Sequence, residues 1–177
     1  MSRKEKPRLL HVAVGVSVIV SSYLLLFDYV HKFLFEAVVR LLSLGQVSVA
    51  KAWTLEGPAI VLSLPNETKF SAVMTWQRSG LLSIMIFGLL FVFLAFPLKG
   101  TLWCKVTWLL FGGFVGLAWN FIRWTLLLLA IYHLGASAFN ILDFLTGPIL
   151  DFLWIVPVWS IGLSVLVSTE KRSKQMG

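Results

Sequence analysis

Four stretches of this chain are apolar over lengths that suit a membrane-spanning helix, and they constrain the fold more than any other feature. They cover residues 9–27, 79–96, 106–134 and 149–167. The hydrocarbon core of a bilayer, about 30 Å thick, is crossed by a helix of about 20 apolar residues. The chain is 58% hydrophobic and 13% charged, whereas a soluble domain averages about 25% charged residues. We therefore predict a mainly α, polytopic membrane protein with about four transmembrane helices in a single membrane domain, 1–177.

Residues 28–45, which follow the first apolar stretch, have the pattern of an amphipathic helix. Apolar side chains recur there at i, i+3 and i+4, while Lys32, Glu36 and Arg40 share another face at i, i+4 spacing. This pattern predicts a helix that lies in the membrane interface. The alternative is that the first span simply continues into solvent.

Residues 46–76 are the least apolar part of the chain. Runs of β-forming residues alternate there with the turn sequences Gly57-Pro58 and Pro65-Asn66-Glu67. This predicts a small β-rich loop, either a three-stranded meander or a pair of hairpins. Asn66-Glu67-Thr68 is also an N-x-T sequon, which a cell can use as a glycan acceptor only if the loop lies outside.

Basic residues set the predicted orientation of the chain. They gather in residues 1–8, in the 97–105 loop and in residues 168–177. In a four-span arrangement these segments lie on one side, which the positive-inside rule assigns to the cytoplasm. We therefore predict a plasma-membrane protein with cytoplasmic N- and C-termini and an external segment 46–76. The basic N-terminus precedes about 19 apolar residues without a small-x-small cleavage site, so we expect an uncleaved signal anchor.

The net charge of +7 comes mostly from those basic segments. No basic patch is interleaved with aromatic residues in the way that single-stranded nucleic acid requires, so no nucleic-acid partner is predicted. Cys104 is the single cysteine, which excludes an intrachain disulfide and a CxxC zinc site. We predict no cofactor and no metal.

Strongly polar side chains are rare in the apolar stretches and gather at their predicted external ends. Arg78 precedes the second span, and Asn120 and Arg123 share one face of the third at i, i+3 spacing. His133 follows about 15 Å further along the same helix. Ionisable groups within a membrane segment cost about 2.5–3.5 kcal/mol at its centre, so they face a partner or a water-filled cavity.

Arg123 therefore requires a partner. Asp151 in the fourth span is the nearest carboxylate in depth, and Asp143 lies closer to the external surface. One interpretation is that these polar groups only join the helices of the bundle. The other is an externally open polar site, lined by Arg78, Asn120, Arg123, His133, Asp143 and Asp151.

The order of these residues resembles the exosortase/archaeosortase family. That family has Cys-[Ser/Thr]-Gly-Leu at the outer start of a span, Asn-x-x-Arg on the next span and a histidine near the outer end of that span. This chain has Arg78-Ser79-Gly80-Leu81, then Asn120-Phe-Ile-Arg123, then His133, and the similarity covers roughly residues 45–165. The resemblance implies a protein-sorting role, because the family's members are membrane cysteine transpeptidases that recognise membrane-anchored C-terminal signals.

The chain departs from the family at the nucleophile, because Arg78 occupies the position of the cysteine. A guanidinium is not a nucleophile and stays protonated, and Cys104 lies at the predicted cytoplasmic end of the third span. The resemblance therefore implies a non-catalytic relative, with a doubly basic external pocket formed by Arg78 and Arg123. The pocket would bind a lipid phosphate, a substrate carboxylate or a partner's acidic side chain. Such a protein would act as a subunit of a membrane complex, beside other membrane-protein subunits, or as a binder of lipid or peptide.

Two enzymatic alternatives stay open. In the first, Ser79 is the nucleophile and His133 the base of a sorting peptidase or transpeptidase, which requires the Ser79 hydroxyl to come within hydrogen-bond reach of His133. In the second, His133, Asp143 and Asp151 bind a metal ion. The contacts of Ser79 and His133 separate these alternatives from the binding protein.

Overall fold

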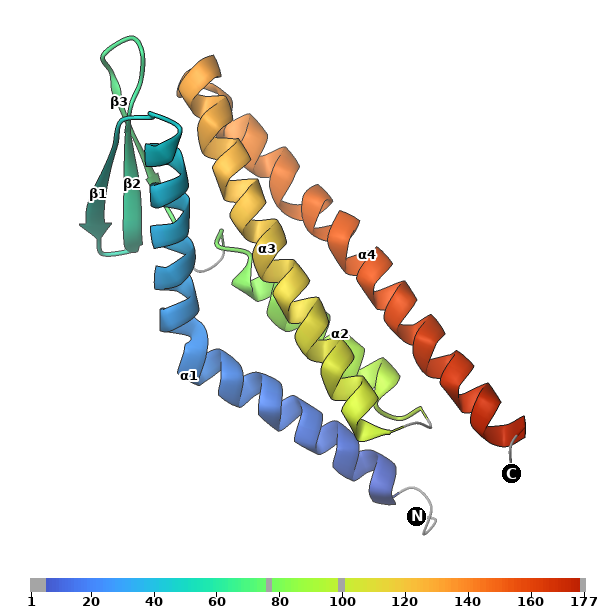
Figure 1. Ribbon diagram of the computed structural model, residues 1–177. Helices are drawn as coiled ribbons and strands as arrows, with labels where there is room; N and C mark the ends of the chain where they lie inside the picture. Colours follow the sequence, from blue (N-terminus) through green and yellow to red (C-terminus); the bar gives the residue numbers. More distant parts are fainter. Residues whose placement is uncertain (1–5, 76–77, 99–100, 176–177) are drawn as a thin grey trace. The chain divides into compact units, whose positions relative to one another are not determined.

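The structure, a computed structural model, describes residues 6–75, 78–98 and 101–175 and is mainly α-helical (Figure 1). Its elements are α1 (Lys6–Leu44), β1 (Val49–Thr54), β2 (Gly57–Ser63), β3 (Lys69–Val73), α2 (Leu81–Ala95), α3 (Leu102–Leu134) and α4 (Ala138–Gln175). The predicted mainly α class with one small β-rich segment is confirmed. Residues 1–5 of the predicted N-terminal tail, Trp76, Gln77, residues 99–100 of the predicted loop and residues 176–177 lie outside the described residues.

Helix length and composition identify the candidate membrane spans among the described residues. Two helices are long and apolar enough, α3 and the Ile141–Leu166 part of α4. A third qualifies if the two sides of a bend in α1, Val12–Tyr23 and Leu25–Leu44, count as one span. α2 is apolar but has 15 residues. Such a helix is about 23 Å long, less than the hydrocarbon core of about 30 Å. The structure therefore has two or three candidate spans, where the sequence predicted four.

The helices run further than the sequence predicted. α1 continues through the predicted boundary at residue 28 and bends earlier, between Val12–Tyr23 and Leu25–Leu44, so the predicted 28–45 segment forms most of the second part. α4 begins at Ala138, inside the predicted 135–148 connection, and runs through most of the predicted tail. The reason for the early start is Gly135, whose φ of 88° and N–H bond to the Ile131 carbonyl at 2.8 Å end α3. Because this cap reverses the chain quickly, only residues 135–137 separate the two helices.

The chain divides into two compact units that interleave along the sequence. Unit 1 comprises Met1–Leu26, Ser83–Gly116 and Leu153–Gly177, and unit 2 comprises Phe27–Leu82 and Leu117–Phe152. The regular elements described in unit 1 are all helical. Unit 2 contains the sheet and every residue of the predicted polar site.

Aromatic side chains and glycines pack the helices of unit 1. The Phe87 ring lies 5.9 Å from that of Phe91 and 5.3 Å from that of Trp154. A Cβ on Gly112 would lie 2.3 Å from the Phe87 ring, so a larger residue there would separate α2 from α3. Lys105 is buried, and its Nζ donates to the carbonyl of Phe96 at 2.8 Å, at the C-terminal end of α2.

The β-rich segment of unit 2 is an antiparallel meander in the order β1-β2-β3, as one of the two sequence predictions had it. Pro65-Asn66-Glu67 forms a turn between β2 and β3, as predicted. Gly57-Pro58 does not: the first turn lies at residues 55–56, and Gly57 already pairs with Thr54 as the first residue of β2.

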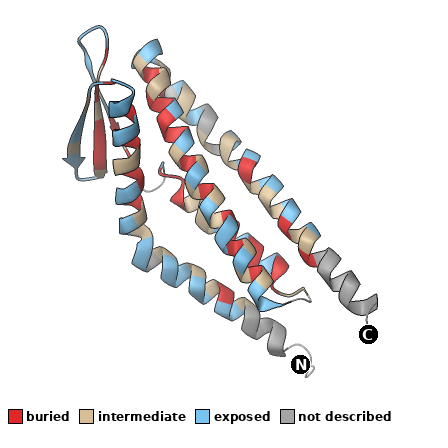
Figure 2. Cartoon of the chain, viewed as in Figure 1, coloured by how far each residue is buried: buried red, intermediate tan, exposed pale blue. Residues whose placement is uncertain are grey.

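One hydrophobic core joins the sheet of unit 2 to its helical segments. The central strand β2 contributes Ala59, Ile60 and Leu62, none of which is exposed, whereas β1 is mostly exposed (Figure 2). The C-terminal half of α1 lies beside the sheet (Figure 1) and buries one face against it. The fully buried members of the core from the helices are Phe35, Val38, Leu42, Trp124, Leu128 and Ile131. This core fixes α1, the sheet and α3 of unit 2 around the segment that follows β3.

Candidate functional site

A tight turn at residues 78–80, which we call the entry turn, leads into α2. The Arg78 N–H donates to Thr75 Oγ1 at 3.3 Å, and the Ser79 N–H donates to the Thr75 carbonyl at 2.9 Å. Gly80 has a φ of 75°, a conformation that glycine adopts without steric cost. The Ser79 hydroxyl accepts the N–H of Leu81 at 3.4 Å, which satisfies a backbone donor at the start of the helix.

The Arg78 guanidinium is held on one edge and open on another. Its Nε lies 3.2 Å from Asp143 Oδ2, and its Cζ lies 5.5 Å from the centre of the Phe139 ring. The side chain is 43% exposed. Its two terminal amino groups make no hydrogen bond with any described residue. Because a guanidinium carries five donors in a planar fork, these groups remain available to an anion.

The backbone of Arg78 is bound by two side chains of α3. Arg123 Nη2 and Trp124 Nε1 both donate to the Arg78 carbonyl, the latter at 2.9 Å. Trp124 was not among the residues predicted from the sequence. The signal available was an indole N–H, which needs an acceptor when buried, on the residue next to Arg123. These two bonds fix the position of the entry turn against α3.

Arg123 is itself enclosed. Its side chain is 5% exposed, and Nη1 lies 3.4 Å from Oδ1 of Asp151, which is 15% exposed. The predicted Arg123–Asp151 ion pair is therefore present. Since Arg123 uses one amino group for Asp151 and the other for the Arg78 carbonyl, the site has one exposed guanidinium where the sequence predicted two. Together with Asp143 and Asp151, the two arginines form two neutral pairs rather than a doubly basic pocket.

Asn120 completes the contact between α3 and the entry turn. It is fully buried, and its Nδ2 donates to the Gly80 carbonyl at 3.4 Å. A Cβ on Gly80 would lie 1.7 Å from Asn120 Oδ1. Glycine is thus required at position 80 by both its φ and the close approach of Asn120. The predicted i, i+3 pair of Asn120 and Arg123 does share one face, and that face holds residues 78–80.

Ser79 and His133 lie in different environments. Ser79 is fully buried, with its hydroxyl bonded to the Leu81 N–H. His133 is exposed and its ring contacts that of Tyr132 at 5.2 Å, and no hydrogen bond joins it to another described residue. The contact that a Ser79–His133 enzyme requires is therefore not formed.

The metal alternative also lacks its ligand set. Among the described residues, no group of three His, Cys, Asp or Glu side chains gathers closely enough to hold a metal ion. Asp143 and Asp151 are each directed to an arginine instead. His133, Asp143 and Asp151 therefore do not form a metal site.

His31 anchors the segment that leads to the entry turn. It is 8% exposed, and its Nε2 donates to the Met74 carbonyl at 2.9 Å. His31 was not predicted from the sequence, because a lone histidine on an amphipathic segment has no distinguishing pattern. Its bond joins the C-terminal half of α1 to the end of β3, four residues before Arg78.

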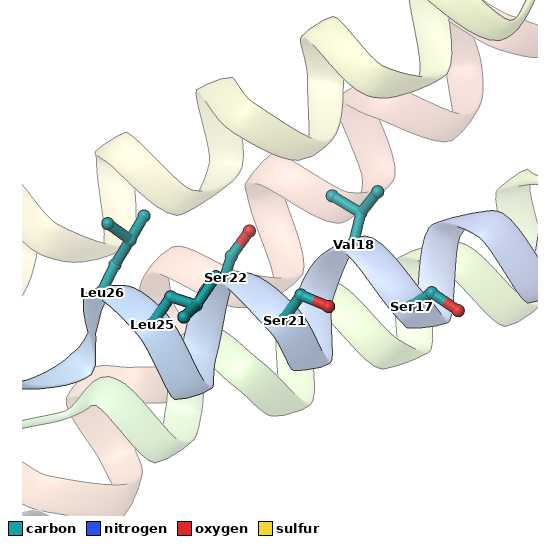
Figure 3. A pocket seen from close by; sticks show the side chains of 6 residues that line it. All are labelled: Ser17, Val18, Ser21, Ser22, Leu25 and Leu26. Atoms are coloured by element: carbon teal, nitrogen blue, oxygen red, sulfur yellow. The ribbon is translucent and has the colours of Figure 1, made fainter.

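A surface groove lies elsewhere, on α1 in unit 1 (Figure 3). It is lined by Ser17, Val18, Ser21, Ser22, Leu25 and Leu26. Its polar side chains are all serines, and it contains none of the predicted site residues. The groove offers no charged or titratable group, so the candidate functional site remains the entry turn and its partners.

No protein-family profile, curated protein or solved structure matches this chain. The fold is mainly helical, and within the described part of the chain two or three helices could span a membrane. Its polar site is an exposed arginine carried by a turn that α3 holds in place.

Proposed function

We propose that this chain is an exosortase/archaeosortase-like integral membrane protein that lacks the nucleophile and binds an anionic group at Arg78. The observation that carries the proposal is the state of the Arg78 side chain. Asp143 and Phe139 contact the guanidinium at the position of the family's cysteine, the side chain is 43% exposed, and its terminal amino groups make no hydrogen bond with any described residue. A charged hydrogen-bond donor at this position binds an anion and does not attack a carbonyl.

In this proposal the chain crosses the plasma membrane four times, with both termini in the cytoplasm and the sheet outside. Residues 28–45 lie along the interface. This placement is supported by the exposed apolar side chains of Tyr29, Phe33 and Leu44 on α1, each at least 70% exposed. Lipid would contact these side chains, and the exposed Lys32 and Arg40 on the same side would reach the headgroups. The opposite face packs on the sheet.

The rigidity of the entry turn supports a binding role. Three side chains of α3 donate hydrogen bonds to its backbone, from Asn120, Arg123 and Trp124. A site that is already ordered loses less conformational entropy when it binds. Asp143 neutralises part of the charge of Arg78 from the Nε edge, so the ligand that binds the terminal amino groups must itself carry a full negative charge.

A phosphate or carboxylate fits the open edge of the fork, because both accept two parallel hydrogen bonds from arginine. The phosphate would belong to a membrane lipid. The carboxylate would belong to a membrane-anchored polypeptide or to another subunit of a membrane complex. Both sources present an anion near the headgroup level, where the proposed topology places Arg78.

The lipid source is tested by native mass spectrometry of the full chain in detergent. Phosphatidylglycerol is added to the wild type and to Arg78→Ala, with phosphatidylcholine of the same acyl chains as reference. A charge-assisted hydrogen bond of about 1.5 kcal/mol corresponds to a loss of about tenfold in affinity. Arg40→Ala is the matched control, because Arg40 is an exposed arginine of unit 2 without an ion pair among the described residues.

The polypeptide source is tested by affinity purification of the same three proteins from membranes. A polypeptide that is retained by the wild type and Arg40→Ala but lost with Arg78→Ala supports the carboxylate source. If neither phosphatidylglycerol binding nor any co-purified polypeptide depends on Arg78, the proposal is wrong.

Catalysis is tested on an exported protein that ends in the kind of signal the family recognises. This signal is a short sequence motif followed by a transmembrane helix and a basic tail. We expect no cleavage by the wild type. Cleavage that Ser79→Ala and His133→Ala each abolish would instead establish the serine enzyme. Arg78→Cys tests for a gain of activity. If this variant cleaves the substrate and the cleavage depends on His133, the family relationship is supported.

A further inference from the structure

The tip of the β2–β3 hairpin carries the sequon Asn66-Glu67-Thr68, which the proposed anion site does not involve. All three residues are exposed. It is the only Asn-x-Ser/Thr triplet of the sequence, since Asn120 and Asn140 are followed two residues later by isoleucine and leucine. The tip belongs to unit 2, but its side chains are not part of the hydrophobic core.

Backbone hydrogen bonds close this turn on itself. The Glu67 N–H donates to the Leu64 carbonyl at 3.0 Å, and the Leu64 N–H donates to the Thr68 carbonyl at 2.8 Å. Glu67 has a φ of 64°. The sequon therefore has a defined conformation in the turn that joins β2 to β3.

The Asn66 side chain is oriented by Thr68. Its Oδ1 accepts the Thr68 hydroxyl at 2.6 Å and the Thr68 N–H at 3.3 Å. The amide nitrogen Nδ2 makes no hydrogen bond with any described residue and belongs to an exposed side chain. The oxygen is thus held by the third residue of the sequon, and the nitrogen is left accessible.

We propose that Asn66 is an N-glycosylation site. The donor is an oligosaccharide joined through its anomeric carbon to a lipid pyrophosphate or phosphate. Asn66 Nδ2 forms a bond to that carbon, the carbon–oxygen bond to the lipid phosphate breaks, and the phosphate leaves with the electron pair. The Nδ2 proton passes to a base of the transferase, and no atom is oxidised or reduced. Thr68 acts as a positioning residue, because its hydroxyl holds the amide oxygen.

The location suits a bulky modification. A glycan is solubilising and needs an exposed attachment point, and here it would replace a hydrogen on a side chain that packs against nothing in the core. Modification also requires that the sheet faces the exterior, as the positive-inside rule predicts. The inference thus depends on the orientation of the chain and is independent of what Arg78 binds.

The test uses the full chain, expressed in cells that N-glycosylate exported proteins at Asn-x-Ser/Thr. Trypsin cleaves after Lys51 and Lys69 and so releases the sequon within residues 52–69. Mass spectrometry of this peptide should show a glycan mass, with fragment ions that place it on Asn66. Asn66→Gln and Thr68→Ala should each remove it completely.

Thr68→Ser is the matched control, because it keeps both the sequon and a hydroxyl at the same position and should keep the glycan. An unmodified Asn66 in the wild type overturns the proposal. A glycan that persists in Asn66→Gln also overturns it, since the attachment would then be to another residue. Loss of modification in Thr68→Ser and Thr68→Ala alike would remove the role assigned to the hydroxyl of Thr68.

Discussion

The two arginine–aspartate pairs of unit 2 differ mainly in exposure. Arg123 and Asp151 are 5% and 15% exposed, and Arg78 and Asp143 are 43% and 18% exposed. Both arginines belong to motifs that the sequence analysis placed in one site. The Arg123 guanidinium bonds to Asp151 through one amino group and to the Arg78 carbonyl through the other. The terminal amino groups of Arg78 bond to no described residue.

This difference separates a structural arginine from a binding one. Breaking a buried ion pair by removing one partner costs about 3–5 kcal/mol, because the remaining charge is left in a medium of low polarity. An exposed pair contributes about 0–1 kcal/mol. If the comparison holds, substitutions around Arg123 change stability, and substitutions of Arg78 change binding.

The largest effect is expected from Arg123→Met. The substitution removes the partner of Asp151 and one of the two donors to the Arg78 carbonyl. We expect the free energy of unfolding in mixed micelles to fall by about 3–5 kcal/mol.

Arg123→Met combined with Asp151→Leu tests the cause of that loss. Since the double variant leaves no buried charge behind, it should recover part of the lost stability. If Arg123 were exposed, Arg123→Met would change the free energy of unfolding very little. A very small change would therefore contradict the burial of Arg123.

Gly80→Ala ranks next, because it disturbs the turn that carries Arg78. The alanine Cβ would meet Asn120 Oδ1 at 1.7 Å and would hold a φ of 75°. Left-handed geometry costs about 1–2 kcal/mol for a non-glycine residue, and forced overpacking adds about 1–3 kcal/mol. Thermal unfolding should show this loss.

The second substitution Asn120→Ala separates the two causes at Gly80. Removing the amide relieves the clash and leaves the backbone strain, so Gly80→Ala/Asn120→Ala should be more stable than the sum of the single variants predicts. Strict additivity would mean that Asn120 does not approach Gly80 as described.

Trp124→Phe should have a smaller effect, about 1 kcal/mol, the usual net value of one hydrogen bond. It removes the indole donor to the Arg78 carbonyl, while Arg123 continues to bond to the same oxygen. Phenylalanine is smaller than the fully buried tryptophan, so lost packing adds to this value. Unfolding of this variant in detergent measures the two losses together, and a loss as large as that of Arg123→Met would show that the Arg123 bond does not compensate for the missing indole bond.

The features of the fold that follow from composition and residue spacing were predictable from the sequence. The apolar runs predict a mainly helical chain, alternating β-formers predict the meander, and a lone arginine in an apolar helix requires a carboxylate, which identifies Asp151. Each of these three predictions rests on a free-energy cost that any fold must avoid. The sequence pattern alone is therefore sufficient to make them.

Details decided by local geometry were not predictable. The early start of α4 follows from the cap at Gly135, and the direct pairing of Gly57 with Thr54 follows from a two-residue turn. The enclosure of Arg123 depends on where the backbone of residue 78 lies, because its carbonyl takes one edge of the guanidinium. Spacing along a helix gives the shared face of Asn120 and Arg123, but it does not say what covers that face.

Arg78→Ala should be the least disruptive of these changes and the most informative about function. Arg78 is exposed and Asp143 is only partly buried, so the free energy of unfolding should change by about 1 kcal/mol. The backbone carbonyl that Arg123 and Trp124 bind is present with any side chain, so the turn should remain intact. Binding of the anion, in contrast, should fall by about tenfold.

Arg78→Lys sharpens this last prediction. Lysine keeps the positive charge but presents a point charge in place of a planar fork, and it cannot offer two parallel donors while bonded to Asp143. If the site binds phosphate or carboxylate through both amino groups, Arg78→Lys should bind nearly as weakly as Arg78→Ala. Wild-type binding by the lysine variant would show that charge alone suffices, and the geometry imposed by Asp143 and Phe139 would then have no role in recognition.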